Sequence, residues 1–368
     1  MISYVMPTRN RPEVLERTLD RIAVLGEHDA EVIIADNASD VAVRTRPMLP
    51  SGVPVRVLRL SENHAAAARN MAAREAHRRS QWIVMLDDDS YPVDLGLLRA
   101  VAQAAPETGA IAAEIFLPRG SATRREQGGL PEVFIGCGVA IRTQLFNRLG
   151  GYDAEFDYYA EEYDLAARLM LAGWQIELDR RFRVVHEKIT RGRDFGRIVR
   201  NLVRNNVWVA QRYAPEAERA TEIRRHITRY AAIARKEGAI AGYARGLTDV
   251  LGTLDGQVRN AMSRAMWDRF TGLSACRAGL REAHAAEPLG RVAVVAAGKN
   301  EWAVLQGLDE LGVEVVGFDE AQTLVVGTLS PGPMLDGLEE LLESDERRVV
   351  SPWSIVTDAS PVAIQSAA

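Results

Sequence analysis

The chain has 368 residues, which is enough for a sizeable core and for more than one domain of average size. With 47% hydrophobic and 26% charged residues, the composition is that of an ordinary globular protein, and a net charge of −5 argues against non-specific nucleic-acid binding by the whole molecule. The two cysteines, Cys137 and Cys276, exclude a disulfide-rich scaffold and favour a reducing compartment.

The opening stretch "MISYVMPTRNRPEVLER" has no long apolar core and no small-residue cleavage site, so no signal peptide is predicted. No part of the sequence approaches the ~20 consecutive apolar residues that a membrane span requires. We therefore expect a cytoplasmic protein, which could still lie on the inner face of a membrane.

Short apolar runs alternate with amphipathic stretches in the first part of the chain. Strands are predicted in "ISYVMPT", "EVIIADNASD", "VRVLRLSEN" and "WIVMLDDDS", and helices in "RPEVLERTLDRIAVL" and in the alanine-rich "HAAAARNMAAREAHRRS". This alternation implies right-handed crossovers and a mostly parallel sheet, whose ligands bind beyond the carboxyl ends of the strands. Asn10, Asp36 and the triplet Asp87 to Asp89 all lie at that edge.

The pattern changes from about Ala110. Strands are predicted in "AIAAEIFL" and "EVFIGCGVAIR", followed by a short helix in "TQLFNRLGGYD" that ends at glycines. A longer helix runs from Ala160 to a stop at Gly173, and the strand "RFRVVHEK" contains His186 near its end.

The segment from Arg191 to Arg235 holds eleven arginines against four acidic residues and is predicted to be helical. One interpretation is an amphipathic helix that packs on the first domain and leaves its arginines in solvent. The other is contact with an anionic membrane surface or with a phosphate-bearing substrate. Helix is predicted to continue weakly to about Ala285.

Strand–helix alternation restarts in the last part of the chain and predicts a small Rossmann-like α/β domain. Its first turn, "AAGKNEW", lacks the spaced glycines of a dinucleotide fingerprint. We expect a structural or oligomerisation module, with a second nucleotide or a regulator near Gly298 and Asp319 as the alternative. The predicted domains are 1–190, a helical segment 191–288 that packs on it, and 289–368.

Three consecutive aspartates, Asp87, Asp88 and Asp89, follow the buried strand that starts at Trp82. Like charges repel, and burying a carboxylate is costly unless it is paired or bound to a metal. A solvated acidic turn is one interpretation. The other is a divalent cation held by Asp87 and Asp89 in D-x-D spacing, because Mg²⁺ and Mn²⁺ prefer oxygen ligands and share their shell with substrate phosphates.

Six motifs in order resemble the inverting, GT-A-fold family 2 glycosyltransferases over roughly residues 1 to 190. They are "VMPTRNRPEVLERTL", "VIIADNASD", "LSENHAAAARNMAAREA", "VMLDDDSYP", "FIGCGVAIRTQLFNRLGGYDAEF" and "EEYDLAARLMLAGW". The resemblance implies the α/β GT-A fold, a nucleoside-diphosphate sugar of UDP or dTDP type as donor, and Mn²⁺ or Mg²⁺ as cofactor. One departure is Ala65, where the family usually has glycine.

The resemblance also implies roles for individual residues. Asp36 would accept a hydrogen bond from the base, and Arg69 would approach the diphosphate or ribose. Asp87 would meet the ribose or the metal, Asp89 would bind the metal, and His186 would be a metal ligand, a phosphate contact or a structural residue. The remaining expected contacts to the nucleotide sugar are Pro7, Thr8, Arg9, Asn10 and Asp88.

The helix that starts near Ala160 supplies the expected catalytic base. Helical spacing places Glu162 within the buried stripe of Leu165 and Leu169, whereas Asp164 and Arg168 form an i,i+4 ion pair worth a few tenths of a kcal/mol on another side. Compensation of the helix dipole is the ordinary interpretation of Glu162. The functional interpretation is a general base that activates an acceptor hydroxyl, with Glu161 as the second choice.

The predicted function is metal-dependent, inverting transfer of a hexosyl group to a carbohydrate, lipid-linked or small-molecule acceptor, in bacterial surface polysaccharide or glycoconjugate synthesis. A homodimer is a further expectation. Two alternatives remain open. The first is a sugar nucleotidyltransferase, which usually has a glycine-rich phosphate loop that "MPTRNRP" lacks. The second is a catalytically weak scaffold or binding module, which would not need the aspartates and Glu162.

Overall fold

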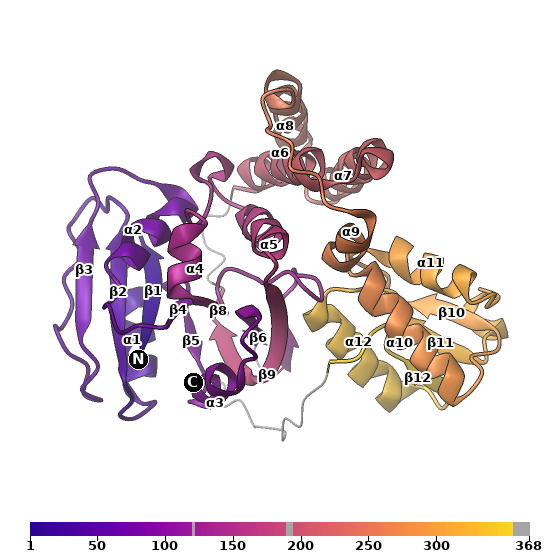
Figure 1. Ribbon diagram of the computed structural model, residues 1–368, viewed down its shortest axis with the longest axis horizontal. Coiled ribbons are helices and arrows are strands. Elements are labelled where there is room, and N and C mark those ends of the chain that lie inside the picture. The colour runs from indigo at the N-terminus through magenta and orange to yellow at the C-terminus, as the bar shows by residue number, and fades with distance from the viewer. Residues whose placement is uncertain (120–121, 189–193, 356–368) are drawn as a thin grey trace. The chain divides into compact units, whose positions relative to one another are not determined.

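A computed structural model describes residues 1–119, 122–188 and 194–355 (Figure 1). Within these, the chain forms two compact units. The first unit comprises residues 1–88, 141–174 and 188–267, and the second comprises residues 89–140, 175–187 and the chain from 268 onward. The predicted boundary at 190/191 lies outside the described residues, and the three-part division remains a prediction.

A parallel sheet forms the centre of the first unit, with strand order β3-β2-β1-β4. The register pairs Thr8 of β1 with Asp36 of β2, so both residues end their strands at the same edge. This confirms the expected parallel sheet. The elements from the first part of the chain are β1 (Ile2–Thr8), α1 (Pro12–Ala23), β2 (Ala30–Asp36), β3 (Val55–Arg59), η1 (Ala65–Ala67), α2 (Ala68–Arg74) and β4 (Trp82–Met85).

The alanine-rich helix is shorter than its propensity predicts. A 3-10 turn, η1, precedes α2, and α2 ends at Arg74 although helix was expected as far as Ser80. Ala65 starts the segment in the left-handed conformation, with φ 51°, and its N–H donates to the side chain of Asn63 at 3.0 Å. Local turn chemistry therefore replaces regular helix at this end.

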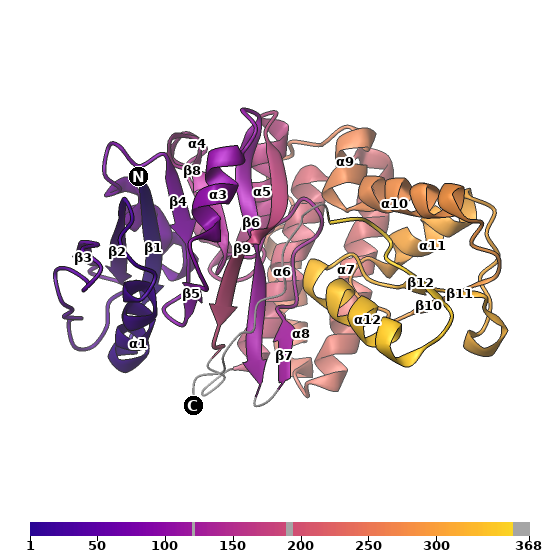
Figure 2. The ribbon, with the colours of Figure 1, turned by 90° about the horizontal axis from the view of Figure 1, so that it is seen from below.

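Three long helices, α6, α7 and α8, pack together in the first unit (Figure 2). Glycines allow the close approach of α8 to α6, because a Cβ on Gly242 would lie 2.1 Å from the carbonyl oxygen of Gly196. The Arg-rich segment is thus helical, as predicted, and breaks at Pro215. The later elements of this unit are α4 (Thr143–Arg148), η2 (Ala154–Phe156), α5 (Glu161–Leu171), α6 (Phe195–Tyr213), α7 (Glu216–Lys236) and α8 (Ile240–Thr253).

The second unit contains two sheets. In the first of them the strand order is β8-β6-β9-β5, with β7 paired to β6. Strands β6 and β9 run parallel, whereas β5 and β7 are antiparallel to their partners. The elements are β5 (Ser90–Pro92), α3 (Gly96–Gln103), β6 (Thr108–Arg119), β7 (Ala122–Arg125), β8 (Val139–Arg142), which runs on into the first unit, and β9 (Gln175–His186).

The other sheet is parallel, with order β10-β11-β12, and confirms the small C-terminal α/β arrangement. The apolar segment "GVEVVGF", in which strand–helix alternation predicts another strand, forms only a single bridge, between Val292 and Val315. The elements are α9 (Arg264–Phe270), which straddles the two units, α10 (Leu273–Ala286), β10 (Val292–Val295), α11 (Glu301–Glu310), η3 (Phe318–Glu320), β11 (Thr323–Val326), α12 (Pro331–Ser344) and β12 (Arg348–Val350).

The strand predicted in "EVFIGCGVAIR" is mostly a loop, since only its last part forms β8. Val133 and Phe134 are nevertheless almost fully buried. Their apolar character therefore reflects the packing of a loop rather than a strand, which sequence pattern alone does not distinguish. Among the described helices, none combines the length and apolarity needed to cross a membrane.

Candidate functional site

The three consecutive aspartates have three different sets of partners. In the first unit, Asp87 forms an ion pair with Arg69, and Asp88 pairs with Arg11 at 2.7 Å. In the second unit, Asp89 faces the Nε2 atom of His186 at 3.4 Å. The mutual repulsion of the triplet is therefore offset by three separate basic groups, and the solvated-turn interpretation is wrong for Asp88 and Asp89, which are each only 4% exposed.

Asp88 is anchored to the start of the first unit. Its Oδ2 accepts a hydrogen bond from the hydroxyl of Thr8 at 2.8 Å, and its backbone carbonyl accepts one from the hydroxyl of Thr18 at 2.6 Å. Together with Arg11, these residues belong to β1 and α1 and the turn between them. Asp88 was expected among the nucleotide-sugar contacts, and in the structure its carboxylate binds Thr8 and Arg11.

Arg69 of α2 is buried beside Asp87, whose side chain is about one-third exposed. Burial acts to lower the pKa of Arg69, but the charge of Asp87 raises it overall, so the guanidinium stays charged. Its Nε atom is buried without a hydrogen-bond partner among the described residues. A buried cation beside a part-exposed carboxylate suits the binding of a diphosphate or ribose.

Asp36 is fully buried at the end of β2. Its carboxylate accepts hydrogen bonds from the backbone N–H groups of Ser39 and Val43, each at 3.0 Å, and pairs with Arg59 at 2.6 Å. Burial would raise the pKa of Asp36, but these partners lower it overall and keep the group ionised. A nucleotide base bound to Asp36 would therefore donate a hydrogen bond to a carboxylate oxygen that already accepts hydrogen bonds from the chain itself.

The turn after β1 is tied to the turn after β2. Asn10 adopts a left-handed conformation with φ 56°, accepts a hydrogen bond from the N–H of Asp40 at 2.7 Å, and donates from its own N–H to Ser39 at 3.0 Å. Pro7 is half-buried, whereas Arg9 and Asn10 are exposed. The segment expected to line a base pocket is thus held in shape by hydrogen bonds within the unit.

The two glutamates at the start of α5 lie in different environments. Glu161 is 6% exposed, and its Oε2 has no hydrogen-bond partner among the described residues. Burial, followed by the charge of Glu162, raises the pKa of Glu161 well above its usual value. Glu162 is only half-buried. This arrangement favours a protonated Glu161 next to a more accessible Glu162.

The turn before α5 contains three non-glycine residues with positive φ, namely Asp157, Tyr159 and Ala160. Such a conformation costs of order 1–3 kcal/mol at each position and persists only where the surroundings impose it. Asn205 of α6 supplies the constraint. It is fully buried, and its side-chain amide lies 2.6–3.0 Å from the backbone carbonyls of Phe156, Tyr158 and Tyr159.

Asp164 is more deeply buried, and has more partners, than the sequence predicts. The i,i+4 pair with Arg168 is present at 2.7 Å, but Asp164 is fully buried and also pairs with Arg212 at 2.9 Å and accepts a hydrogen bond from Tyr213 at 2.6 Å. The sequence-based estimate treats the pair as exposed, and that premise is wrong for Asp164. Asp164 joins α5 to α6 and holds the helix that bears the glutamates.

His186 ends β9 in the second unit, and the antiparallel pairing of β5 with β9 brings Asp89 to it. Its other ring nitrogen, Nδ1, lies 2.8 Å from Oε2 of Glu126 and 3.5 Å from the sulfur of Cys137. Burial acts to lower the pKa of His186, but Cys137, Asp89 and Glu126 raise it overall. The surroundings of this imidazole thus favour positive charge.

This donor set fits a divalent cation. Asp89 offers a carboxylate and His186 an imidazole nitrogen, and Glu126 lies where a metal-bound histidine usually finds an acceptor for its second ring N–H. Sequence analysis named Asp89 and His186 as candidate metal ligands and did not single out Glu126 or Cys137 as their neighbours. Neither of these two stands at a recognisable spacing from His186, and Cys137 is simply a small residue in an apolar run.

Residues 3–151 match the protein family described as "Glycosyl transferase family 2". A curated relative, the O-antigen biosynthesis protein RfbC of Myxococcus xanthus, is 24% identical over 226 residues, which is 51% of this chain and 17% of the relative. The chain thus spans about a sixth of that protein's length.

Two solved structures are similar to the chain. S. aureus TarS 1-349 in complex with UDP-GlcNAc is 14% identical, with 85% of this chain and 92% of that chain covered and a TM-score of 0.49. The mannosyltransferase PcManGT from Pyrobaculum calidifontis, in complex with GDP-Man and Mn²⁺, is 18% identical, with 78% and 86% covered and a TM-score of 0.44. The family match thus covers residues 3–151, and the strand topology confirms the mixed α/β fold that the motifs predict.

Proposed function

We propose that the chain is a family 2 glycosyltransferase, which transfers a hexosyl group from a nucleoside-diphosphate sugar to an acceptor hydroxyl with inversion at the anomeric carbon. The observation that supports it best is the division of the aspartate triplet. Asp88 is tied to the scaffold, which leaves Asp87 beside the buried Arg69 and Asp89 beside His186. A triplet that served only as a turn would not need two of its carboxylates beside separate buried basic residues.

For the donor, a UDP or dTDP sugar is proposed. The turns that follow β1 and β2 would receive the base, with Pro7, Thr8, Arg9 and Asn10 on one side and Asp36 on the other. The hydrogen bonds that already fix Asn10 and Asp36 support this, because a preformed pocket loses less entropy on binding.

For the cofactor, Asp89 and His186 would hold Mn²⁺ or Mg²⁺, with Asp87 as the other carboxylate of the D-x-D spacing. The nitrogen donor of His186 favours Mn²⁺ over Mg²⁺, which prefers oxygen ligands. When bound, the ion would neutralise negative charge that develops on the departing diphosphate.

Glu162 is proposed as the general base. It would take the proton of the acceptor hydroxyl while that oxygen forms a bond to the anomeric carbon and the bond from this carbon to the diphosphate breaks. Arg69 would bind the departing phosphate oxygens. The raised pKa of Glu161 makes it less suited to accept a proton at neutral pH, so Glu161 is the second choice.

For the acceptor, we propose a bacterial surface polysaccharide or glycoconjugate, which the likeness to an O-antigen biosynthesis protein supports. Peripheral contact with the inner face of a membrane is proposed for the layer of α6, α7 and α8. Its exposed residues include Arg224, Arg229, Arg235 and Arg245 together with Leu251, which is 85% exposed. A homodimer and the three-part domain division are also proposed.

The test is thermal unfolding of the whole chain with UDP, dTDP, GDP and CMP, each with and without Mn²⁺. A ligand that binds only the folded state adds about 2.7 kcal/mol at a hundredfold excess over its dissociation constant. A Mn²⁺-dependent rise with one diphosphate would support the proposal and identify the donor class. If none of the nucleotides raises the unfolding temperature, the scaffold alternative is favoured. A nucleotidyltransferase would instead form a nucleotide sugar from a nucleoside triphosphate and a sugar phosphate.

A further inference from the structure

Glu126, the carboxylate beside His186, stands at the end of the β7 strand in the second unit. Its backbone N–H donates to the carbonyl of Ile115 in β6 at 2.9 Å, which continues the pairing of β6 with β7. The side chain is buried, and Oε2 reaches Nδ1 of His186 at 2.8 Å. Glu126 therefore lies where it can fix the orientation of the imidazole and leave Nε2 toward Asp89.

Helix α12 of the C-terminal domain and its N-cap residue, Ser330, form hydrogen bonds with the chain on both sides of Glu126. Before it, Arg125 donates from its backbone N–H to Asp336 at 2.9 Å and from its guanidinium to Asp336 and Glu339 at 2.8 and 2.7 Å. After it, the N–H of Gly128 donates to the hydroxyl of Ser330 at 3.1 Å, and this hydroxyl donates back to the carbonyl of Gly128.

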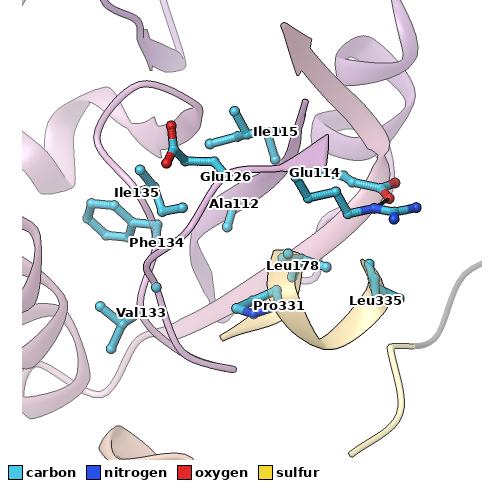
Figure 3. Close-up of a pocket in the computed structure, with 14 residues that line it drawn as sticks. Ala112, Glu114, Ile115, Glu126, Val133, Phe134, Ile135, Leu178, Pro331 and Leu335 are labelled. Carbon is cyan, nitrogen blue, oxygen red and sulfur yellow. Dashed lines mark hydrogen bonds and ion pairs between the residues drawn. The ribbon is translucent and has the colours of Figure 1, made fainter. Parts of the chain in front are cut away.

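The first turn of α12 also touches Glu126 itself. A Cβ atom on Gly332 would lie 2.3 Å from the backbone carbonyl of Glu126, so only glycine permits this approach. Figure 3 shows Pro331 and Leu335 of α12 on one side of a pocket whose other lining includes Glu126 and Ile135. The contact is thus a packed interface with directed hydrogen bonds.

We infer that the C-terminal domain is a positioning module for the metal site, in which α12 sets the place of Glu126 and Glu126 sets the ring of His186. Metal-bound histidines generally donate their second ring N–H to a carboxylate, and loss of such a partner weakens metal affinity about 10–100-fold. Neither Glu126 nor α12 contacts the metal in this scheme. The inference rests on the proposed function, because it assumes that His186 binds a divalent cation.

The experiment measures Mn²⁺ affinity of the whole chain by electron paramagnetic resonance, with Mn²⁺ alone as the probe and no donor present. Glu126→Gln and Gly332→Val should each weaken Mn²⁺ binding at least tenfold. Glu340→Gln is the matched control, because Glu340 is an exposed residue of the same helix that pairs with Arg124 of the same strand at 3.0 Å. Its affinity should equal that of the wild type.

Thermal unfolding of each variant shows whether it is folded. If Gly332→Val does not fold, Asp336→Asn replaces it, since this change removes the charge that Arg125 binds while it keeps the shape of the side chain. Unchanged Mn²⁺ affinity in folded Gly332→Val or Asp336→Asn would overturn the role of α12, and unchanged affinity in Glu126→Gln would overturn the role of Glu126. A wild-type chain that binds no Mn²⁺ would instead contradict the metal site of the proposed function, and with it this inference.

Discussion

The guanidinium of Arg11 lies 2.7 Å from Oδ1 of Asp88, and this pair ties the middle aspartate of the triplet to the turn before α1. Three carboxylates in a row repel one another. Here the central one is neutralised by the scaffold, and its two neighbours lie beside other basic groups. The pair therefore predicts different consequences for substitutions at adjacent positions.

Asp88→Ala should destabilise the protein by about 1–3 kcal/mol, because it leaves Thr8 and Arg11 without their buried acceptor. Asp89→Ala should change stability less and abolish Mn²⁺-dependent donor affinity. Urea unfolding and calorimetric titration with Mn²⁺ and the donor nucleotide check both expectations. Equal Mn²⁺ dependence in wild type and Asp89→Ala would show that Asp89 does not bind the metal.

Glu162→Gln should keep donor binding and lower turnover by ~10²-fold or more, which is the usual contribution of general-base catalysis. Glu161→Gln is the matched neighbour and should lower turnover by much less, because the structure favours a protonated Glu161 already. Single-turnover rates at saturating donor measure both. If Glu161→Gln shows the larger loss, the base is Glu161.

Glu161 also predicts a pH dependence of stability. Its pKa is raised in the folded protein, so between its ordinary value of about 4.3 and the raised value the folded state binds more protons than the unfolded state. The free energy of unfolding contributed by this group should therefore fall as pH rises above about 4.3. In Glu161→Gln this contribution is absent, so its stability relative to wild type should increase from pH 4 to pH 7 in urea unfolding experiments. A constant difference across this range would contradict the raised pKa.

Sequence pattern predicted most of the strands and the edge at which Asp36 ends its strand beside Thr8, because hydrophobic periodicity and the end of a strand are local properties. It could not predict the burial of Asp164, since Arg212 and Tyr213 reach that residue from a helix almost fifty positions later. Glu126 was missed for the same reason. Its partner His186 is distant in sequence, and only the packing of β6 between β7 and β9 brings the two residues together.

Asn205→Ala should lower both stability and turnover. The amide donates to carbonyls of the strained turn before α5, and its removal leaves those of Tyr158 and Tyr159 without this donor, at about 1–3 kcal/mol for each unsatisfied group. The carbonyl of Phe156 keeps a hydrogen bond from Arg204. The change should also loosen the start of the helix that bears Glu162. Asn206→Ala is the matched control, because Asn206 is also buried in α6 but donates to Leu202 of its own helix. Asn206→Ala should lower stability and leave turnover unchanged. Equal turnover in the two variants would limit Asn205 to a structural role.

Ala65→Gly should stabilise the protein by about 1 kcal/mol. Ala65 has φ 51°, and a left-handed conformation costs a residue with a Cβ roughly 1–2 kcal/mol. Glycine avoids this cost, but its greater flexibility in the unfolded chain offsets part of the gain in stability. The loop therefore keeps the backbone shape that glycine would adopt most easily, although the sequence has alanine. Ala66→Gly is the control, since Ala66 is not among the residues with positive φ and should lose stability instead. Urea unfolding of both variants measures the difference, and a destabilised Ala65→Gly would mean that contacts of the alanine methyl group outweigh the backbone strain.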